Sequence, residues 1–265
     1  MATKSANIED LTAFASEVIR QSGQEALRYY GKGKVEVKFD DDLVTEAELF
    51  VTDLFQGHLK ARFPEHLVFQ YDQQNKHYSH EGERYLWIFD PLDGVANFQA
   101  GIPIWGTSLA LLENFWPILG LFYMPVTGDL FYARAGHKAF RGEEELHTSS
   151  QESINDESLL LTHSRFHHYY HSTFPGKIRD LGCTSAHLCY VAMGRAEAAI
   201  IAHESYQDLA AARVIAETAG AKFFKMDGSN FSLDDYLDGD KIDDHLLVVN
   251  TDMRSQVLNY LEESS

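Results

Sequence analysis

Apolar residues recur at helical spacing near the start of the chain. Between residues 8 and 30 they fall every three or four positions, at Ile8, Leu11, Phe14, Ala15, Val18, Ile19, Ala26 and Leu27. This spacing places them on one face of an amphipathic helix. Asn7 stands where it can cap the helix, and Gly31 and Gly33 stand where they can end it. The pattern therefore predicts a helix over residues 8–30.

A second helix is expected to begin at Thr45. A strand-like segment, VEVKF at residues 35–39, comes before it. Thr45 and Glu48 have the Ser/Thr-x-x-Glu spacing of a capping box, which makes Glu48 the third residue of the helix. Apolar residues then follow at Leu49, Leu54, Phe55 and Leu59.

Short apolar runs separated by turn residues begin at residue 86. The runs YLWIFD, TSLALLE, PILGLFYMP and DLFYARA predict antiparallel strands, with turns at residues 113–114 and 127–129. An acidic loop is expected at residues 143–145.

The second half alternates strand-like and helix-like segments. Strands are expected at residues 159–162 and 198–202, a helix at 185–193, and a last helix at 208–219, which ends at Gly220. Helices and strands in alternating blocks indicate an α/β (α+β) protein with layered packing.

The composition is that of a folded, acidic protein. Of 265 residues, 45% are hydrophobic, and 22 Lys and Arg stand against 40 Asp and Glu, so the formal net charge is −18. This charge disfavours nucleic acid and anionic lipid as partners. No apolar stretch approaches the roughly 20 residues that span a bilayer, so we expect no membrane span. No linker or repeat divides the chain, which predicts a single domain over 1–265 with lobes of roughly 1–150 and 151–265.

Cysteine usage points to a reducing compartment. Only Cys183 and Cys189 are present, and the first residues lack the apolar core of a signal peptide. We therefore predict a cytoplasmic protein without disulfides, in which both cysteines are small buried residues.

The pentapeptide Asp90-Pro91-Leu92-Asp93-Gly94 is the strongest chemical signal in the chain. It follows an apolar strand predicted at residues 86–89 and places two carboxylates three residues apart on a turn. Hard divalent cations prefer such oxygen ligands. Gly94 would let the backbone N–H groups of residues 94–96 approach an anion at the start of a helix. The same residues also fit a polar turn with a helix cap.

Longer stretches around this motif extend the signal. DPLDGVANF, GIPIWGTSLALLEN, PILGLFYMPVTGDLFYARAGHKAF and QDLAAARVIAETAGA follow in order between about residues 42 and 220. In these stretches the chain resembles the inositol monophosphatase family of magnesium-dependent phosphomonoesterases. The resemblance implies a layered αβαβα fold, attack of water on a phosphate monoester, and frequent homodimers.

The resemblance also implies a metal site. Asp90, Asp93 and Asp208 match three family ligands of the second Mg²⁺, which stabilises the leaving oxygen, and Mn²⁺ is an alternative ion. Asp208 could equally cap the helix that follows it, a role compatible with metal binding.

Two positions that the family uses to activate the attacking water differ in this chain. Tyr71 stands where the family has a Glu ligand when His66 is matched to the family's histidine, and a neutral phenol binds Mg²⁺ poorly. Asp72 could substitute after a shift of one residue. Val95 replaces a Thr whose hydroxyl orients the water, so reduced Mg²⁺ occupancy is expected.

Three further positions concern the acceptor of the water's proton and the recognition of the substrate. Glu48 occupies the family's general-base position, although its capping role is the preferred interpretation. Gln207 replaces the Trp before the third Asp, and Ile201 replaces a Glu that holds a substrate hydroxyl. Selectivity for inositol is therefore not expected.

Phosphate binding is expected to survive these replacements. The family holds phosphate largely through main-chain N–H groups, which here belong to Gly94, Val95 and Ala96. Gly182 and Thr184 match a segment near the substrate hydroxyls.

A group of histidines offers a different metal chemistry. His163, His167 and His171 would share a face if this segment were helical, and His-x3-His can hold zinc; His168 lies among them. A solvated helix or loop is the preferred interpretation. The acidic runs at residues 40–42, 143–145 and 234–240 are interpreted as solvated too.

The leading hypothesis is a phosphatase-like protein that binds a phosphorylated polyol or sugar, or free phosphate, and hydrolyses it slowly or not at all. One alternative is an active Mg²⁺ phosphatase in which Asp72 and Glu48 rebuild the first metal site. Another is a non-catalytic binding or regulatory protein.

Overall fold

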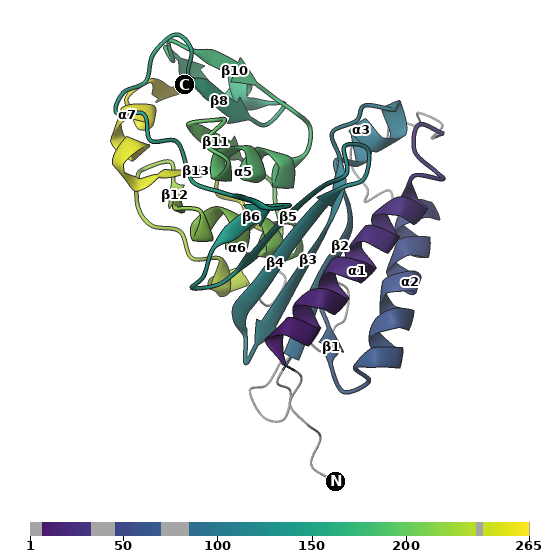
Figure 1. Ribbon diagram of the computed structural model, residues 1–265. Coiled ribbons are helices and arrows are strands. Elements are labelled where there is room, and N and C mark those ends of the chain that lie inside the picture. The colour runs from purple at the N-terminus through teal and green to yellow at the C-terminus, as the bar shows by residue number, and fades with distance from the viewer. Residues whose placement is uncertain (1–6, 33–45, 70–84, 237–240, 265) are drawn as a thin grey trace.

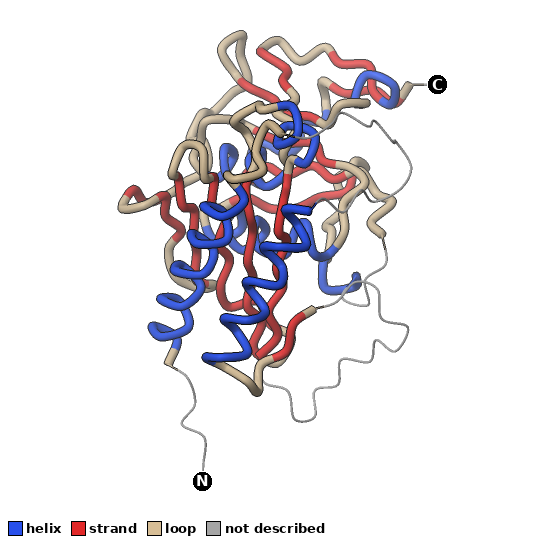
Figure 2. The backbone as a smooth tube through the Cα atoms, turned by 90° about the vertical axis from the view of Figure 1, so that its right-hand side faces the viewer, coloured by secondary structure: helices blue, strands red, loops and turns tan. Residues whose placement is uncertain are grey.

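Two long helices cover one face of the first β-sheet. The computed structural model describes residues 7–32, 46–69, 85–236 and 241–264. Helix α1 (Ile8–Ala26) and helix α2 (Glu46–Arg62) run side by side along the strands (Figures 1 and 2). Their apolar faces bury Leu11 and Phe55 in one cluster with Trp87 of the sheet, as the helical spacing predicts.

The first sheet has seven strands in sequence order. Strands β1 and β2 are parallel, and every later pair is antiparallel, so the predicted antiparallel strands are confirmed. The strands are β1 (Leu67–Val68), β2 (Tyr85–Asp93), β3 (Gly106–Glu113), β4 (Trp116–Met124), β5 (Asp129–Arg134), β6 (Ala139–Arg141) and β7 (Glu144–Glu145).

The second sheet is mixed, with the order β10-β8-β11-β13-β12. Its first three strands are parallel and the last two pairs are antiparallel. The strands are β8 (Leu159–Thr162), β10 (Lys177–Arg179), β11 (Ala198–Ile201), β12 (Ala221–Lys225) and β13 (Leu246–Asn250), and β9 (Tyr170–Ser172) pairs separately with β14 (Leu261–Glu263).

Helices α5 (Thr184–Ala192) and α6 (Tyr206–Thr218) lie between the two sheets (Figure 1). Helix α6 approaches β4 so closely that a Cβ atom on Gly120 would lie 2.4 Å from the carbonyl oxygen of Ala211. Gly120 therefore sets the distance between this helix and the first sheet.

Shorter helices complete the outer layer. Helix α4 (Phe166–Tyr169) and helix α7 (Arg254–Leu258) contribute to one apolar cluster with β11 and β13. Helix α3 (Val95–Ala100) follows β2, and the 3₁₀ turns η1 (Leu233–Tyr236) and η2 (Thr251–Met253) flank β13 in sequence. The succession of helix, sheet, helix, sheet and helix confirms the predicted layered αβαβα fold.

Several predicted boundaries were wrong. Helix α1 ends at Ala26 because the N–H groups of Arg28 and Tyr29 bond to carbonyls three residues back, which tightens the chain into turns. Residues 144–145 form β7 instead of a loop, with Glu145 paired to Lys138. The helix predicted as the last one is followed by further strands and by α7.

Some predictions fall outside the described residues. These concern the VEVKF segment, the acidic run at 40–42, Thr45, Tyr71 and Asp72. Among the described residues, no helix is long and apolar enough to cross a bilayer.

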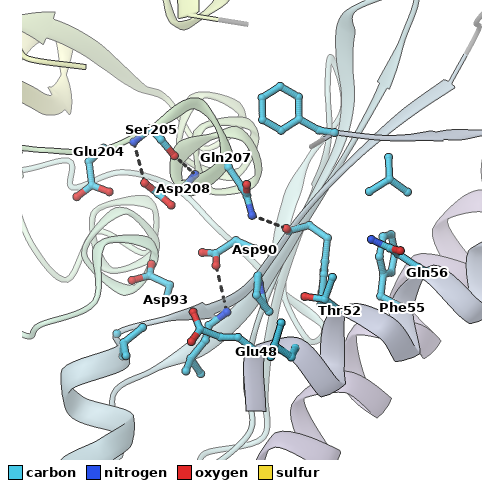
Figure 3. A pocket seen from close by; sticks show the side chains of 18 of the residues that line it. Glu48, Thr52, Phe55, Gln56, Asp90, Asp93, Glu204, Ser205, Gln207 and Asp208 are labelled. Carbon is cyan, nitrogen blue, oxygen red and sulfur yellow. Dashed lines mark hydrogen bonds between the residues drawn. The ribbon is translucent and has the colours of Figure 1, made fainter. Parts of the chain in front are cut away.

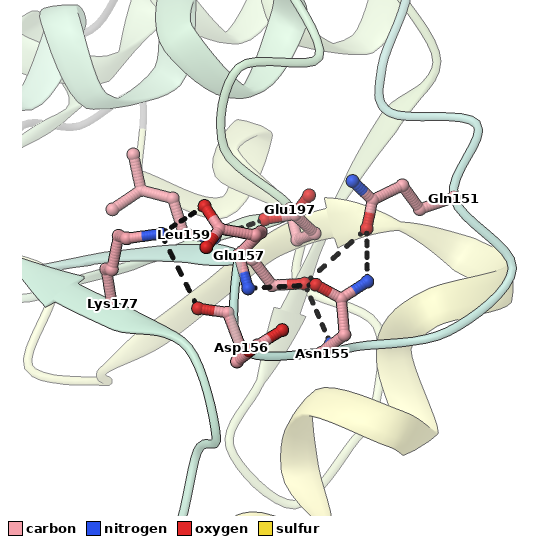
Figure 4. Close-up of polar contacts among 8 residues, drawn as sticks. Gln151, Asn155, Asp156, Glu157, Leu159, Lys177 and Glu197 are labelled. Carbon is pink, nitrogen blue, oxygen red and sulfur yellow. Dashed lines mark hydrogen bonds and ion pairs between the residues drawn. The ribbon is translucent and has the colours of Figure 1, made fainter.

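A buried glutamate joins two strands of the second sheet. Glu197 is 5% exposed, and its carboxylate accepts a hydrogen bond from the N–H of Leu159, whose carbonyl accepts one from the N–H of Glu197 (Figure 4). Nearby, Lys177 donates to Glu157 at 2.6 Å. These contacts fix the register at which β8 and β11 start, and so the position of the loops at their other ends.

Candidate active site

Carboxylates dominate a pocket of about 560 Å³ between α2, the end of β2 and the start of α6. Figure 3 shows the side chains of these three elements turned toward one space. The acidic residues that line it are Glu48, Asp53, Asp90, Asp93, Glu204 and Asp208, and Lys241 lines it as well. The structure therefore brings together the three aspartates predicted as metal ligands, although residue 208 lies 118 positions beyond residue 90.

The DPLDG segment continues the strand, where a turn after the strand was predicted. Strand β2 runs to Asp93, and its pairing with β3 shifts between Asp90 and Asp93. Pro91 lies in this irregular stretch and has no N–H to donate to a neighbouring strand. The bulged strand end places both carboxylates on the pocket.

Backbone N–H groups anchor each of the three aspartates. Asp90 Oδ1 accepts from the N–H of Leu92 at 3.1 Å. Asp93 accepts from the N–H of Thr184 at 3.1 Å and from the N–H of Ser185 through its other oxygen. Asp93 thus caps the first turn of α5, whose N-cap residue provides no side-chain bond.

Asp208 is part of a capping box and is not the N-cap that was considered for it. Ser205 is the N-cap of α6, and its hydroxyl accepts from the N–H of Asp208. Asp208 Oδ2 accepts in return from the N–H of Ser205 at 2.7 Å. The helix starts two residues earlier than predicted because Ser205 provides the cap.

Crowding of these acids changes their ionisation. Burial, Asp208 and then Asp93 raise the pKa of Asp90 well above its usual value, and Glu48 adds to this. Burial raises the pKa of Glu204 in the same way, with further contributions from Asp208 and Asp93. A bound divalent cation would offset this repulsion and favour the ionised carboxylates.

The start of α3 lies beside these carboxylates. Gly94 has φ of 88° and precedes Val95, the first helical residue. A Cβ at Gly94 would lie 3.1 Å from both the Cβ of Cys183 and the carbonyl oxygen of Ile104. Residues 94–96 thus form a helix start, as predicted, and the first N–H groups of a helix have no acceptor within the helix.

Asn97 links this helix to the segment before α5. Its amide donates at 2.7 Å to the carbonyls of both Ile104 and Leu181. Gly182 has φ of 71°, and a Cβ there would lie 2.9 Å from the Asn97 side chain. The predicted substrate segment at Gly182 and Thr184 is therefore held next to the predicted phosphate loop.

Two of the proposed water-activating positions can be located. Glu48 lies in the first turn of α2 and lines the pocket together with Val95. Tyr71 and Asp72 lie outside the described residues, so the first metal site stays a prediction. The hydroxyl that Glu48 would need at position 95 is replaced by a methyl group.

The replacements at residues 201 and 207 have different consequences. Ile201 is 1% exposed and sits in the core, so it has no place in the pocket. Gln207 lines the pocket, and its amide donates to the carbonyl of Phe89 at 2.8 Å, which ties the start of α6 to β2.

Glu204 is a pocket residue that sequence reasoning missed. Its Oε1 accepts a hydrogen bond from the Thr184 hydroxyl at 2.6 Å. It follows β11 and comes directly after His203, which has φ of 64°. The signal in the sequence was the short polar stretch His203-Glu204-Ser205 between a buried strand and a helix.

The acids fit a hard divalent cation by their chemistry, because all of them offer carboxylate oxygens. The three aspartates instead accept hydrogen bonds from backbone N–H groups. In the described parts of the chain, no three His, Cys, Asp or Glu side chains are placed so that they could hold a metal ion. A carboxylate oxygen has two lone pairs, so a backbone N–H and a cation can share it.

The prediction that both cysteines are buried is confirmed, and the histidines do not share one helical face. Cys183 and Cys189 are buried and free, and burial raises the pKa of both thiols. His167 belongs to α4, whereas His163 precedes that helix and His171 lies in β9. Among the acidic runs, Asp234 is not simply solvated, since it pairs with Arg213 at 2.9 Å.

The layered fold, with a carboxylate pocket at the end of β2 and the start of α6, fits the class of metal-dependent phosphomonoesterases. The chain belongs to the inositol monophosphatase family, whose model matches residues 7–258. This family is magnesium-dependent and binds phosphorylated polyols such as inositol monophosphate.

Individual relatives agree with this assignment. The chain is 30% identical over 230 residues to a histidinol-phosphatase of Chlorobaculum parvum, covering 83% of this chain and 87% of that protein. It is 29% identical to inositol monophosphatase 1 of Solanum lycopersicum, covering 84% and 85%. Among solved structures, an IMPase of Thermotoga maritima has the same fold, with a TM-score of 0.78, 23% identity, and 95% and 96% coverage.

Proposed function

We propose that this protein binds phosphate monoesters of polyols or sugars in the carboxylate pocket and hydrolyses them slowly or not at all. The observation that carries the proposal is the meeting of Asp90, Asp93 and Asp208 with the start of α3 in one pocket. The family provides the reaction class, a phosphomonoesterase.

Asp90, Asp93 and Asp208 would hold Mg²⁺, or Mn²⁺ in its place. When bound, the ion supplies positive charge next to the leaving oxygen of the ester. The raised pKa of Asp90 supports this assignment, because several crowded carboxylates favour a cation among them. Asp93 has a second role, since it also holds the first turn of α5.

The phosphate would lie against the N–H groups of Gly94, Val95 and Ala96. These groups carry the positive end of a helix start, and replacing a side chain does not remove them. Glu48 would stand near the attacking water, but Val95 offers no hydroxyl through which a proton could pass. Weak hydrolysis follows from that missing hydroxyl together with Tyr71.

Glu204 and Thr184 would recognise the alcohol part of the substrate. Thr184 lies in the segment predicted to contact substrate hydroxyls, and Glu204 accepts its hydroxyl hydrogen. A carboxylate at this place can accept a hydrogen bond from a substrate hydroxyl as well. It would replace the glutamate that the family has at the position of Ile201.

A second candidate is an amino alcohol phosphate. One similar protein is named a histidinol-phosphatase, and an ammonium group would pair well with the carboxylate of Glu204. This candidate requires that hydrolysis be efficient, with Asp72 and Glu48 rebuilding the first metal site.

Phosphate release tests these possibilities directly. The full chain would be assayed with Mg²⁺ and Mn²⁺ on inositol monophosphate, sugar phosphates and histidinol phosphate, with Asp90→Asn as the matched inactive control. Slow release on polyol or sugar phosphates that vanishes in the control supports the proposal. Fast release on histidinol phosphate alone would favour the second candidate, and release that persists in Asp90→Asn would overturn both.

A further inference from the structure

A buried histidine of α5 lies behind the segment that is predicted to contact the substrate hydroxyls. His187 is 3% exposed and belongs to the first turns of this helix. Burying a polar ring costs free energy unless its nitrogen atoms find partners. Side chains of a helix lean toward its N-terminus, and the ring of His187 accordingly reaches the link at residues 180–183 between β10 and α5.

The ring accepts a hydrogen bond from the backbone of that link. The backbone N atom of Leu181 lies 2.9 Å from Nε2 of His187 and donates its hydrogen to it. A backbone N–H can only donate, so Nε2 is the unprotonated nitrogen of a neutral ring. Burial lowers the pKa of His187, which favours this neutral form.

Asp180 does not compete for the same ring nitrogen. Its Oδ1 lies 3.8 Å from Nε2 of His187, which is too far for a hydrogen bond. That oxygen accepts instead from the N–H of Gly182 at 2.7 Å. Nε2 of His187 therefore acts as an acceptor for Leu181 and not as a donor to Asp180.

Both backbone groups of Leu181 are held in this way. The N–H donates to His187, and the carbonyl accepts from the side-chain amide of Asn97 at 2.7 Å. Asn97 also donates to the carbonyl of Ile104, so its own position does not depend on the link. These bonds fix the peptide groups before and after Leu181 between α5 and α3.

The fixed link ends at the residue that is proposed to recognise the alcohol. The N–H of Thr184 donates to Asp93, and its hydroxyl donates to Glu204. Gly182 lies between Leu181 and Thr184 with φ of 71°, and a glycine leaves the chain more conformational freedom than any other residue. A side chain that holds Leu181 therefore restricts where the link can place Thr184.

We propose that His187 is a positioning residue for recognition of the substrate alcohol. By holding Leu181, it keeps the Thr184 hydroxyl directed at Glu204. His187 does not itself line the carboxylate pocket, so its effect on a ligand has to pass through the link. The inference rests on the proposed binding of polyol or sugar phosphates and adds a residue that sets the geometry of their recognition.

His187→Gln and His187→Asn form a matched pair of variants. Both place a neutral amide at the buried position, but only glutamine is long enough to put an acceptor near the place of Nε2. Calorimetry on the full chain with Mg²⁺ would use inositol monophosphate and inorganic phosphate as the probes. Affinity for inositol monophosphate should fall about tenfold or more in His187→Asn and stay near the wild-type value in His187→Gln. Affinity for inorganic phosphate should not change in either variant.

A double-mutant cycle shows whether His187 acts through Glu204. If it does, His187→Asn should weaken the binding of inositol monophosphate much less in the Glu204→Gln protein than in the wild type, because both changes remove one recognition geometry. Additive losses would overturn the positioning role. Cys189→Ala, at a buried position of the same helix, is the control for a general loosening of α5. An equal loss of affinity in this control would overturn the proposal.

Two measurements without any ligand test the contact itself. The amide hydrogen of Leu181 should exchange at least about tenfold faster in His187→Asn than in the wild type or in His187→Gln, while N–H groups later in α5 keep their rates. In the wild type, a scalar coupling between the nitrogen nuclei of the Leu181 amide and His187 Nε2 should report the hydrogen bond even if His187→Asn folds poorly. An absent coupling or an unchanged exchange rate would overturn the proposal.

The outcomes also separate this inference from the proposed function. A wild-type protein that binds neither inositol monophosphate nor inorganic phosphate would overturn both. A wild-type protein that binds inositol monophosphate as well as His187→Asn does would overturn the positioning role alone.

Discussion

The Thr184 hydroxyl donates a 2.6 Å hydrogen bond to Glu204, which joins the start of α5 to the segment before α6. The two residues are 20 positions apart, and each stands at the start of a helix or directly before its cap. The backbone N–H of the same Thr184 donates to Asp93. One residue thus connects the proposed metal ligand to the proposed substrate-recognition carboxylate.

This connection makes Glu204→Gln a selective test of substrate recognition. Glutamine keeps an oxygen that can accept from Thr184 but removes the charge. We expect affinity for polyol phosphates to fall on the order of tenfold, as for one lost charge-assisted hydrogen bond. Affinity for inorganic phosphate should stay the same, because the proposed phosphate site is the start of α3. Calorimetry with both ligands measures this, and equal losses for both would contradict it.

Asp90→Asn should separate metal binding from stability. The substitution removes a 7% exposed charge that is repelled by its neighbours, so the metal-free protein should unfold at the same temperature or higher. Affinity for Mg²⁺ and Mn²⁺ should fall on the order of tenfold or more, since one charged ligand is lost. Thermal unfolding with and without the ion measures the stability of the metal-free protein and the stabilisation that the ion adds. Asp10→Asn, an exposed change of equal charge in α1, is the control.

Asp93→Asn should behave differently from Asp90→Asn. Both oxygens of Asp93 accept from N–H groups of α5, and an amide presents only one acceptor. We therefore expect a loss of about 1–3 kcal/mol in the free energy of unfolding, even without metal. Denaturant titration measures it. An unchanged stability would mean that the cap contributes nothing.

Gly94→Ala tests the close packing of the predicted phosphate loop against the start of α5. A left-handed alanine costs about 1–2 kcal/mol, and its Cβ would also crowd Cys183 at 3.1 Å. Gly128→Ala is the matched control, because Gly128 has φ of 78° with nothing within 4 Å of a Cβ. If the contact with Cys183 matters, Gly94→Ala should destabilise the protein more than this control does. Only Gly94→Ala should also weaken the affinity for phosphate. Equal effects would show that only backbone strain matters.

Local patterns predicted most of the fold because they depend on neighbouring residues. The period of α1, its cap at Asn7 and the hairpins from β3 to β5 follow from spacing and turn residues. The ends of helices and strands were less predictable. The end of α1 depends on a turn formed by backbone hydrogen bonds, and the irregular end of β2 at Pro91 depends on pairing with β3.

The site was only partly predictable for a physical reason. The DPLDG motif is contiguous, so Asp90 and Asp93 could be found from their spacing. The bonds from Thr184 to Asp93 and to Glu204 join residues 91 and 20 positions apart, and no local pattern specifies them. Glu204 was overlooked because the family's glutamate aligns with Ile201, which the structure buries in β11.

A pH-dependent signal is expected from His66 and Trp87. The indole Nε1–H of Trp87 donates to Nδ1 of His66 at 3.0 Å, and burial lowers the pKa of His66 from 6.5 to about 4. The folded state thus excludes a proton that the unfolded state binds between pH 6.5 and 4. This contribution to stability is full above pH 6.5 and is lost as the pH falls toward 4.

Tryptophan fluorescence and denaturant titration between pH 7 and 4 check the signal. The wild type should lose more stability over this range than His66→Gln, and its fluorescence change should have a midpoint near pH 4. His58→Gln, at an exposed position of α2, should match the wild type. A midpoint near 6.5, or no difference between wild type and His66→Gln, would contradict the prediction.

The last prediction tests whether the replaced residues account for the weak hydrolysis that we propose. Tyr71→Glu should recruit a first metal ion, Val95→Thr should orient a water, and Glu48→Asp should accept its proton through the new hydroxyl. Because these groups act on one water, each single change should leave phosphate release near background. The triple variant should gain Mg²⁺-dependent turnover of about 10²-fold or more on at least one polyol or sugar phosphate.

Two results would contradict this account in different ways. If the unmodified chain already turns over as fast as the triple variant, the site is not impaired, and Asp72 with Glu48 becomes the better explanation. If the triple variant binds two metal ions yet stays inactive on all substrates, the defect lies in recognition of the alcohol. Glu204 and Thr184 would then be the first residues to change, because Glu204 lines the pocket and accepts the hydrogen bond of the Thr184 hydroxyl.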